Sequence, residues 1–171
     1  TDQKYNDVHI NGVLMNDMES GQFRYSLVGG LNRMTRNADN VLAFENGGYN
    51  MPNMAGGVNY DFRAASFAAG HRVSLGAANR NYTLRGVYTY STGLMPSGWA
   101  VTANLTYRWA NRGYVEGTFY NALSYFLGVE KIFGNHSLSF ATWGNPTERS
   151  TQGASTDEAY WMANSLSLIH I

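Results

Sequence analysis

The sequence predicts an all-β protein whose larger part is an antiparallel meander of about five strands belonging to a transmembrane β-barrel. Two observations lead to this class. Between residues 70 and 143, runs of alternating apolar and polar side chains are separated by turn signals rich in glycine and asparagine, which is typical of antiparallel strands joined end to end. One run, residues 99–109, is about twice as long as the five or six residues of an ordinary globular strand.

The run over residues 99–109 separates apolar from polar side chains along its whole length. A strand has a period of two, so one face meets an apolar environment and the other meets water. Ten steps of about 3.3 Å, tilted by about 40°, span roughly 25 Å, the height of the lipid-facing band of an outer-membrane barrel. A tryptophan at each end of the apolar face would lie in the aromatic girdles of such a barrel. The apolar face carries Trp99, Val101, Ala103, Leu105, Tyr107 and Trp109, and the other carries Ala100, Thr102, Asn104, Thr106 and Arg108.

Four further runs continue the meander with less regular alternation. Tight turns are expected where glycine and asparagine accept positive φ easily. The expected strands cover residues 70–78, 81–92, 119–133 and 136–143, with tight turns at 79–81 and 134–136 and longer connections at 92–98, at 111–117 and after residue 145.

Composition excludes several classes of protein. The chain has 171 residues, enough for about one domain, and 12 Lys and Arg balance 12 Asp and Glu, so no basic field for nucleic acid is expected. Charged and aromatic residues each make up 14%, which excludes a disordered chain. Without cysteine there is no disulfide framework and no thiolate site. No apolar stretch is long enough for a transmembrane helix, whereas a transmembrane barrel stays open.

The first third and the two ends differ from the meander. Paired glycines at residues 29–30, 47–48 and 56–57 interrupt the first third, so we expect a boundary near residues 62–68. The chain opens at Thr1 with neither Met nor signal segment, as an internal piece of a longer protein would. Residues 166–171, Leu-Ser-Leu-Ile-His-Ile, back-translate to CTG TCT CTT ATA CAC ATC. We interpret them as sequencing-adapter read-through rather than as an apolar strand end.

Little in the sequence points to catalysis, and we expect no enzymatic activity, no cofactor and no metal site. The four histidines lie in unrelated contexts, and no zinc-protease, nucleophile-elbow or nucleotide-binding motif occurs. Asp17 and Glu19 would share a face if a strand ran through them and could then serve acid–base chemistry or calcium, but a solvated loop is the commoner setting. The polar face that includes Asn104 and Arg108 either contacts a polar solute or is simply a wetted wall.

Residues 8–21, Val-His-Ile-Asn-Gly-Val-Leu-Met-Asn-Asp-Met-Glu-Ser-Gly, resemble the plug-domain signature of TonB-dependent outer-membrane receptors, in the form common among Bacteroidetes. Gly56 and Gly57 match the paired glycines of the closing plug strand, but Asn59, Tyr60 and Asp61 stand where that pattern has Ile, Asn and Ile. An ordered series of segments resembles the first barrel strands of the same receptors: residues 90–93, 98–101, 113–120, 124–126, 129–131, 136–139 and 144–149.

The resemblance implies a fragment of an importer in the outer membrane of a Gram-negative bacterium. In that family a plug fills a barrel of about 22 strands, and TonB delivers the energy that rearranges the plug and admits an iron chelate, cobalamin or a glycan. Residues 1–65 would then be the C-terminal part of the plug and residues 66–165 the first barrel strands. The TonB-contacting segment would lie upstream of Thr1. The partners implied are TonB, outer-membrane lipid, a small-molecule or glycan ligand and, as a candidate, a surface lipoprotein. The residues expected to approach the ligand are Asn16, Asp17 and Arg24 of the plug and Asn104 and Arg108 of the lumen face.

Two alternatives remain at this point. A porin or adhesin barrel without a plug has no use for some sixty residues that precede the meander. A soluble β-sandwich, such as a glycan-binding module or a glycosidase, predicts that the apolar face of residues 99–109 is buried against a second sheet, and a glycosidase adds a convergent pair of carboxylates.

Overall fold

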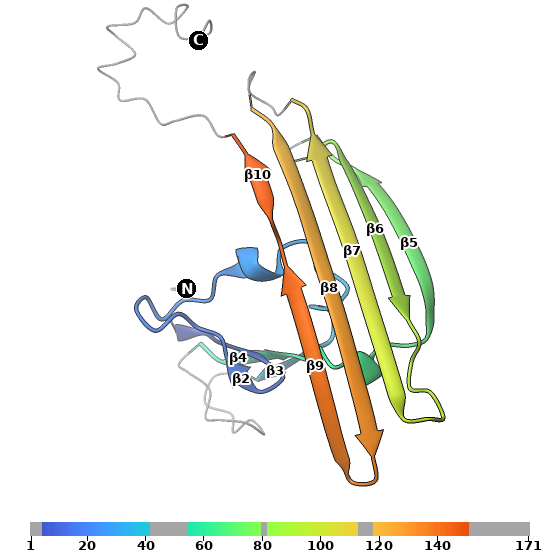
Figure 1. Ribbon diagram of the computed structural model, residues 1–171. Helices are drawn as coiled ribbons and strands as arrows, with labels where there is room; N and C mark the ends of the chain where they lie inside the picture. Colours follow the sequence, from blue (N-terminus) through green and yellow to red (C-terminus); the bar gives the residue numbers. More distant parts are fainter. Residues whose placement is uncertain (1–4, 42–54, 80–81, 113–117, 151–171) are drawn as a thin grey trace, which may run out of the picture.

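The computed structural model describes residues 5–41, 55–79, 82–112 and 118–150, so the interpretation of residues 166–171 lies outside the described residues. These residues form two β-sheets and two short 3₁₀ segments, η2 (Tyr25–Val28) and η3 (Ala64–Ser66), as Figure 1 shows. The described part of the chain contains no α-helix, which agrees with the predicted all-β class. No helix found there has the length and apolar character that crossing a membrane would require.

The first sheet has four short strands in the order β2-β1-β4-β3. β1 (Asp7–Ile10) and β2 (Val13–Leu14) form a hairpin whose two loop residues, Asn11 and Gly12, have φ of 51° and 80°. Positive φ at both positions is what a type I′ turn requires, and Asn-Gly is the preferred sequence for it. β4 (Gly57–Tyr60) pairs in parallel with β1 and antiparallel with β3 (Ala38–Val41).

The second sheet, called the large sheet below, is the antiparallel meander that the sequence predicts. From β5 to β9 each strand pairs with its neighbour in the chain, and the bounds of these five lie within about three residues of the expected ones. The β8–β9 connection is a two-residue loop with φ of 58° at Gly134 and no positive φ at Asn135, as in a type II′ turn. The strands are β5 (Gly70–Ala77), β6 (Leu84–Ser91), β7 (Trp99–Ala110), β8 (Tyr120–Phe133), β9 (His136–Gly144) and β10 (Thr147–Arg149).

The connection predicted after residue 145 starts too early, because β9 and β10 are one strand in two pieces that reaches Arg149. Gly144 pairs with Tyr125 and Thr147 pairs with Ala122, so the register passes unchanged through the interruption. Pro146 has no N–H to give to the ladder, yet its carbonyl still accepts a hydrogen bond of 3.0 Å from the Leu123 N–H. Proline in the sequence therefore marks a local break in this strand and not its end.

The large sheet has its apolar side chains on the exposed face and its polar side chains on the buried one. On β7, Leu105 and Tyr107 are 49% and 48% exposed, whereas Thr102 and Thr106 are fully buried. β8 repeats this pattern, with Leu127 42% exposed and Ser124 fully buried. The sandwich alternative predicted a buried apolar face on residues 99–109, so within the described residues the structure contradicts it.

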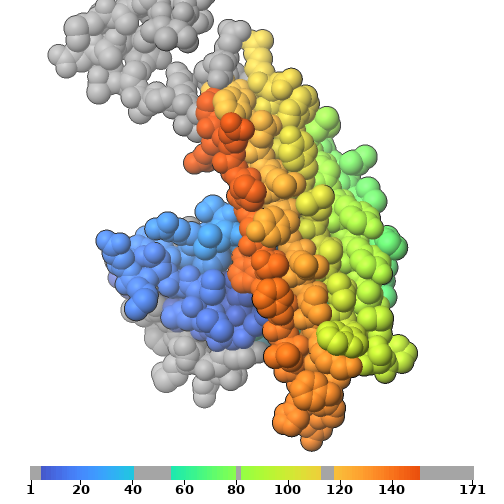
Figure 2. All heavy atoms as spheres, viewed as in Figure 1, coloured from blue at the N-terminus to red at the C-terminus, as the bar shows by residue number. Residues whose placement is uncertain are grey.

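What covers the polar face is the first part of the chain, described residues 5–41 and 55–67, which we call the N-terminal unit. Figure 2 shows this unit, in blue, standing against one side of the large sheet. The buried hydrophobic core belongs mostly to the N-terminal unit and meets the large sheet where the ring of Phe62 contacts Phe126 at 5.6 Å and Trp143 at 5.4 Å between centroids. Phe126 is the large buried aromatic residue on the covered face of β8, where Ser124 and Glu130 are also buried, and it anchors the unit there. The expected boundary at residues 62–68 falls in the segment that joins the two sheets.

Candidate functional site

Side-chain hydroxyls of the large sheet hold backbone carbonyls of the N-terminal unit. Thr106 Oγ1 donates to the Gly30 carbonyl at 2.9 Å, and Ser124 Oγ donates to the Gly29 carbonyl at 2.8 Å. Thr102 Oγ1 donates to the Ala64 carbonyl at 3.1 Å in the same way. These contacts bring loop backbone directly onto the strands, which satisfies buried polar groups on both sides.

Glycine is required where this backbone approaches most closely. Gly30 has φ of 86°, and a Cβ built on it would overlap Oγ of Ser124. At Gly29 a Cβ would lie 2.8 Å from Nδ2 of Asn145. The glycine pair that interrupts the sequence at residues 29–30 is therefore the point at which the unit is seated on β7 and β8.

Beside the glycine pair lies a pocket of about 520 Å³, which we call the amide pocket. Asn145 links two other lining residues: its Nδ2 donates to the Ser26 carbonyl at 2.9 Å, and its Oδ1 accepts a hydrogen bond of 3.0 Å from Nη2 of Arg108. The Arg108 guanidinium lies 5.5 Å from the centroid of the Tyr120 ring. The lining is Ser26, Leu27, Gly29, Arg108, Tyr120, Trp143, Gly144, Asn145, Thr147 and Arg149.

The chemistry of the amide pocket is that of binding. It offers two guanidinium groups, from Arg108 and Arg149, with an amide and two aromatic rings, which together can hold a polar or ring-shaped solute. As far as the described residues line it, the pocket contains neither carboxylate nor histidine, so they supply no general base there. Part of its lining lies near the end of the sheet where β7 stops and β8 begins, because Tyr120 and Arg149 pair with each other there.

Of the five residues expected to approach a ligand, Arg108 alone lines the amide pocket. Asn104 is 3% exposed beneath the N-terminal unit, and its Nδ2 donates to Oγ1 of Thr89 at 2.7 Å. Oγ1 of Thr106, which donates its proton to the Gly30 carbonyl, lies 3.3 Å from Oδ1 of Asn104. The structure thus places the Asn104 amide in a covered hydrogen-bond network rather than on an open wall.

Asn16 ties together the loop that follows β2. Its Oδ1 accepts the Val8 N–H at 2.8 Å, and its Nδ2 donates to the carbonyls of Asn6 and Gly21, both at 2.9 Å. Both N–H donors of this amide and one of the two acceptor sites on its oxygen are used within the N-terminal unit. In the structure, Asn16 therefore shapes a loop.

Asp17 caps a turn. It does not share a strand face with Glu19, because no strand runs through these residues. The chain turns at residues 18–20, and Oδ1 of Asp17 accepts the N–H groups of Glu19 at 3.0 Å and Ser20 at 2.9 Å. These hydrogen bonds, from Ser20 first, hold the pKa of the Asp17 carboxyl below its ordinary value. Arg24 lies 3.7 Å from Asp17, and its side chain is 71% exposed, so this pair is a surface contact.

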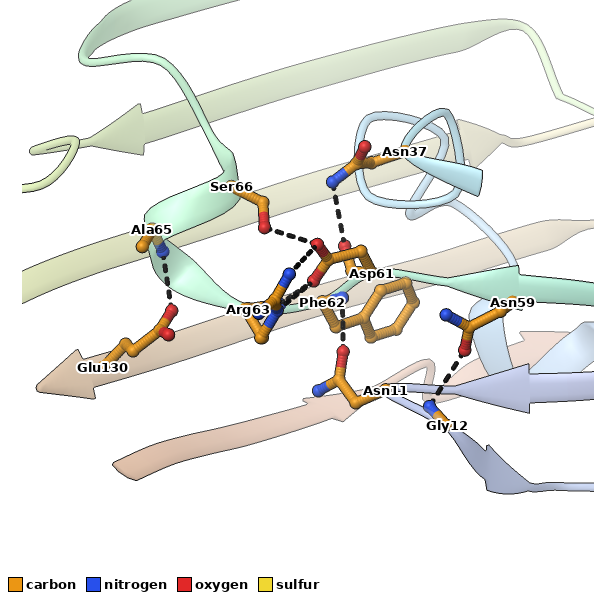
Figure 3. Close-up of polar contacts among 10 residues, drawn as sticks. All are labelled: Asn11, Gly12, Asn37, Asn59, Asp61, Phe62, Arg63, Ala65, Ser66 and Glu130. Carbon is orange, nitrogen blue, oxygen red and sulfur yellow. Dashed lines mark hydrogen bonds and ion pairs between the residues drawn. The ribbon is translucent and has the colours of Figure 1, made fainter. Parts of the chain in front are cut away.

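A second polar cluster fastens the segment between the two sheets, as Figure 3 shows. The Asp61 carboxylate accepts from Nη2 of Arg63 at 2.8 Å and from Oγ of Ser66 at 2.6 Å. Burial raises the pKa of the Asp61 carboxyl, but these hydrogen bonds outweigh burial and leave that pKa below its ordinary value. Glu130 of β8, 2% exposed, accepts the Ala65 N–H at 2.9 Å, which joins this cluster to the large sheet.

The sequence interpretation missed Tyr120, Trp143 and Asn145 as members of a site. The feature of the sequence that could have identified them is the alternation of β9. Because β9 continues in register beyond Pro146, Asn145 lies opposite Ser124. Within the described residues, no group of three or more acidic or histidine side chains lies together as a metal site. Comparisons of the chain with models of known families, with curated proteins and with solved structures find no match.

Proposed function

We propose that this chain is the end of the plug and the first barrel strands of a TonB-dependent importer in the outer membrane of a Gram-negative bacterium. The observation that carries the proposal is the arrangement of the large sheet, whose apolar face is exposed and whose polar face is covered by the N-terminal unit. In water such a face would be an exposed apolar patch, whereas in a bilayer it is the lipid-facing surface.

The length and the ends of the strands support a membrane span. β7 has 12 residues and β8 has 14, long enough for strands that cross the hydrocarbon layer at a tilt. At one end, Nζ of Lys131 lies 5.0 Å from the ring centroid of Trp99. An aromatic ring beside a cation is typical of the boundary between lipid and water.

The N-terminal unit supports an assignment as a plug. It packs on the polar face through backbone carbonyls, a core of aromatic rings and the Glu130 contact, so it fills space that a pore would otherwise leave to water. A porin or adhesin barrel without a plug leaves this unit without a role. Within the described residues, the outer edges of β5 and of β9 and β10 pair with no further strand, and a bilayer requires partners for both edges.

In the proposed importer, the amide pocket faces the ligand and the chain performs no catalysis. Movement of the unit under the pull of TonB would break the hydroxyl-to-carbonyl bonds at Gly29 and Gly30 and open a path along the polar wall. The imported solute belongs to the classes that the resemblance implies: an iron chelate, cobalamin or a glycan.

The test uses two adjacent residues of β9 that face opposite ways. Phe140, 64% exposed, lies on the apolar face, and Ser139, also exposed, lies on the polar face opposite Glu130. In the native protein in bilayers, a spin label at residue 140 is expected to collide with dissolved oxygen, and one at residue 139 with a water-soluble nickel chelate. The same environment at both positions would contradict the membrane assignment.

Dependence on TonB tests the transport step separately. Deleting TonB in the host should abolish uptake while leaving the protein in the outer-membrane fraction. Uptake unchanged by the deletion would argue for a passive barrel.

A further inference from the structure

A second pocket, on the other side of the glycine pair, is lined by four arginines and is called the arginine pocket below. Arg33 and Arg36 come from the N-terminal unit, Arg72 from β5 and Arg85 from β6. The pocket has a volume of about 130 Å³, and no acidic residue lines it among the described residues. The remaining lining is Gly30, Asn32, Ser74, Val87 and Thr89.

These guanidinium groups are not neutralised by the described part of the protein. The ion pairs found there join Arg24 to Asp17 and Arg63 to Asp61, and neither involves the arginine pocket. Nε of Arg85 is buried and makes no hydrogen bond to the described residues, which is costly for a charged donor.

The register of the sheet adds a like-charge contact. Arg85 stands directly opposite Arg108 on the neighbouring strand, so the two cations share one face of the sheet. Like charges at opposed positions destabilise a sheet. Nε of Arg108 is also buried without a hydrogen-bond partner among these residues, so both members of the pair have an unsatisfied donor.

We propose that the arginine pocket is an anion site that takes the oxyanion group, a phosphate, sulfate or carboxylate, of a small solute. Guanidinium groups bind such groups through paired N–H donors, and an anion would satisfy the buried donor and screen the arginines from one another. A volume of 130 Å³ equals about four water molecules at roughly 30 Å³ each, which suits one oxyanion group rather than a whole organic ligand.

The position of the pocket indicates whether the anion comes from a lipid headgroup or from a dissolved solute. Arg72 and Arg85 lie on the polar face of the large sheet, because they share it with the buried Thr89, so a lipid headgroup on the apolar face does not reach them. A solute that enters along the polar wall does. The inference deepens the proposed function by adding an anionic ligand, but the site itself depends on neither a membrane nor TonB.

The test is calorimetric titration of the purified native protein with inorganic phosphate, and with glucose 6-phosphate to distinguish the free ion from an oxyanion carried on a larger solute. Saturable binding that weakens as salt is raised is expected for at least one of these probes. Arg85→Gln and Arg33→Gln should each weaken it about tenfold or more, as expected for loss of a charge-assisted hydrogen bond.

Arg24→Gln is the matched control, because Arg24 lies on the N-terminal unit but outside the pocket, and it should leave binding unchanged. Arg85→Lys keeps the charge and loses the paired donors, so intermediate affinity is expected from it even if Arg85→Gln fails to fold. Absence of binding by the folded native protein, or equal losses in the pocket variants and in Arg24→Gln, would overturn the anion site. Because this assay needs neither bilayer nor transport, such a result leaves the importer proposal standing, and failure of uptake tests leaves the anion site standing.

Discussion

The rings of Phe62 and Phe126 meet edge to face at 5.6 Å, and this contact joins the N-terminal unit to the large sheet. Phe62 lies two residues after the end of β4, in the segment that joins the two sheets, and Phe126 lies in the middle of β8 on its covered face. Both side chains are almost fully buried. Phe126 therefore gives the covered face of β8 a defined docking point, so the unit is fixed in position by packing as well as by hydrogen bonds.

Phe126→Ala should therefore cost about 3–5 kcal/mol in the free energy of unfolding, since it removes a buried ring and leaves a cavity. Guanidinium titration of the native protein, followed by tryptophan fluorescence, measures this cost. Phe140→Ala makes the same change on β9 at a position 64% exposed and should cost much less. Equal costs would mean that Phe126 does not anchor the unit.

The second prediction concerns the seat of the glycine pair. Gly30→Ala forces a Cβ into a backbone at φ of 86° and against Ser124, so we expect a loss of roughly 1–3 kcal/mol in stability. Ser124→Gly in the same chain removes the obstructing side chain and should recover part of that loss. A double-mutant cycle measures the coupling, and additive effects would contradict the close contact.

The third prediction compares one added charge on the two faces of the large sheet. Ala103 lies on the apolar face near the middle of β7, and Ala103→Arg should cost about 2–4 kcal/mol when the native protein is refolded into lipid vesicles. Ser139→Arg, on the polar face opposite Glu130, should cost close to nothing. Thr102 is unsuitable as the polar-face control because it is fully buried beneath Ala64. Similar costs at residues 103 and 139 would count against a lipid-facing sheet.

The strands of the large sheet could be predicted from the sequence because their two faces meet different environments over many consecutive residues. The predicted bounds of β7 agree with the structure to within one residue, whereas the continuation of β9 into β10 past Pro146 was not predicted. The parallel pairing of β1 with β4 could not be predicted, since it joins residues about fifty positions apart and depends on tertiary packing.

The site was less predictable than the sheet. Alternation identifies Asn104 and Arg108 as polar-face residues, but it does not say which of them the N-terminal unit covers. The structure buries Asn104 and leaves Arg108 in the amide pocket. The cluster of Arg33, Arg36, Arg72 and Arg85 forms only when the unit docks, because two of these residues come from the unit and two from the strands.

The fourth prediction follows from the Asp61 carboxylate, which holds Arg63 and Ser66 beside the segment between the two sheets. Its pKa is lower in the folded protein than the ordinary value of 3.8, so the folded state favours the ionised form. The resulting stability is fully present above the unfolded pKa and is lost as pH falls through the folded pKa. Unfolding measured between about pH 6 and pH 2 should therefore show a loss of stability in acid that Asp61→Asn reduces. An acid dependence identical in Asp61→Asn and in the native protein would show that other carboxylates cause the loss.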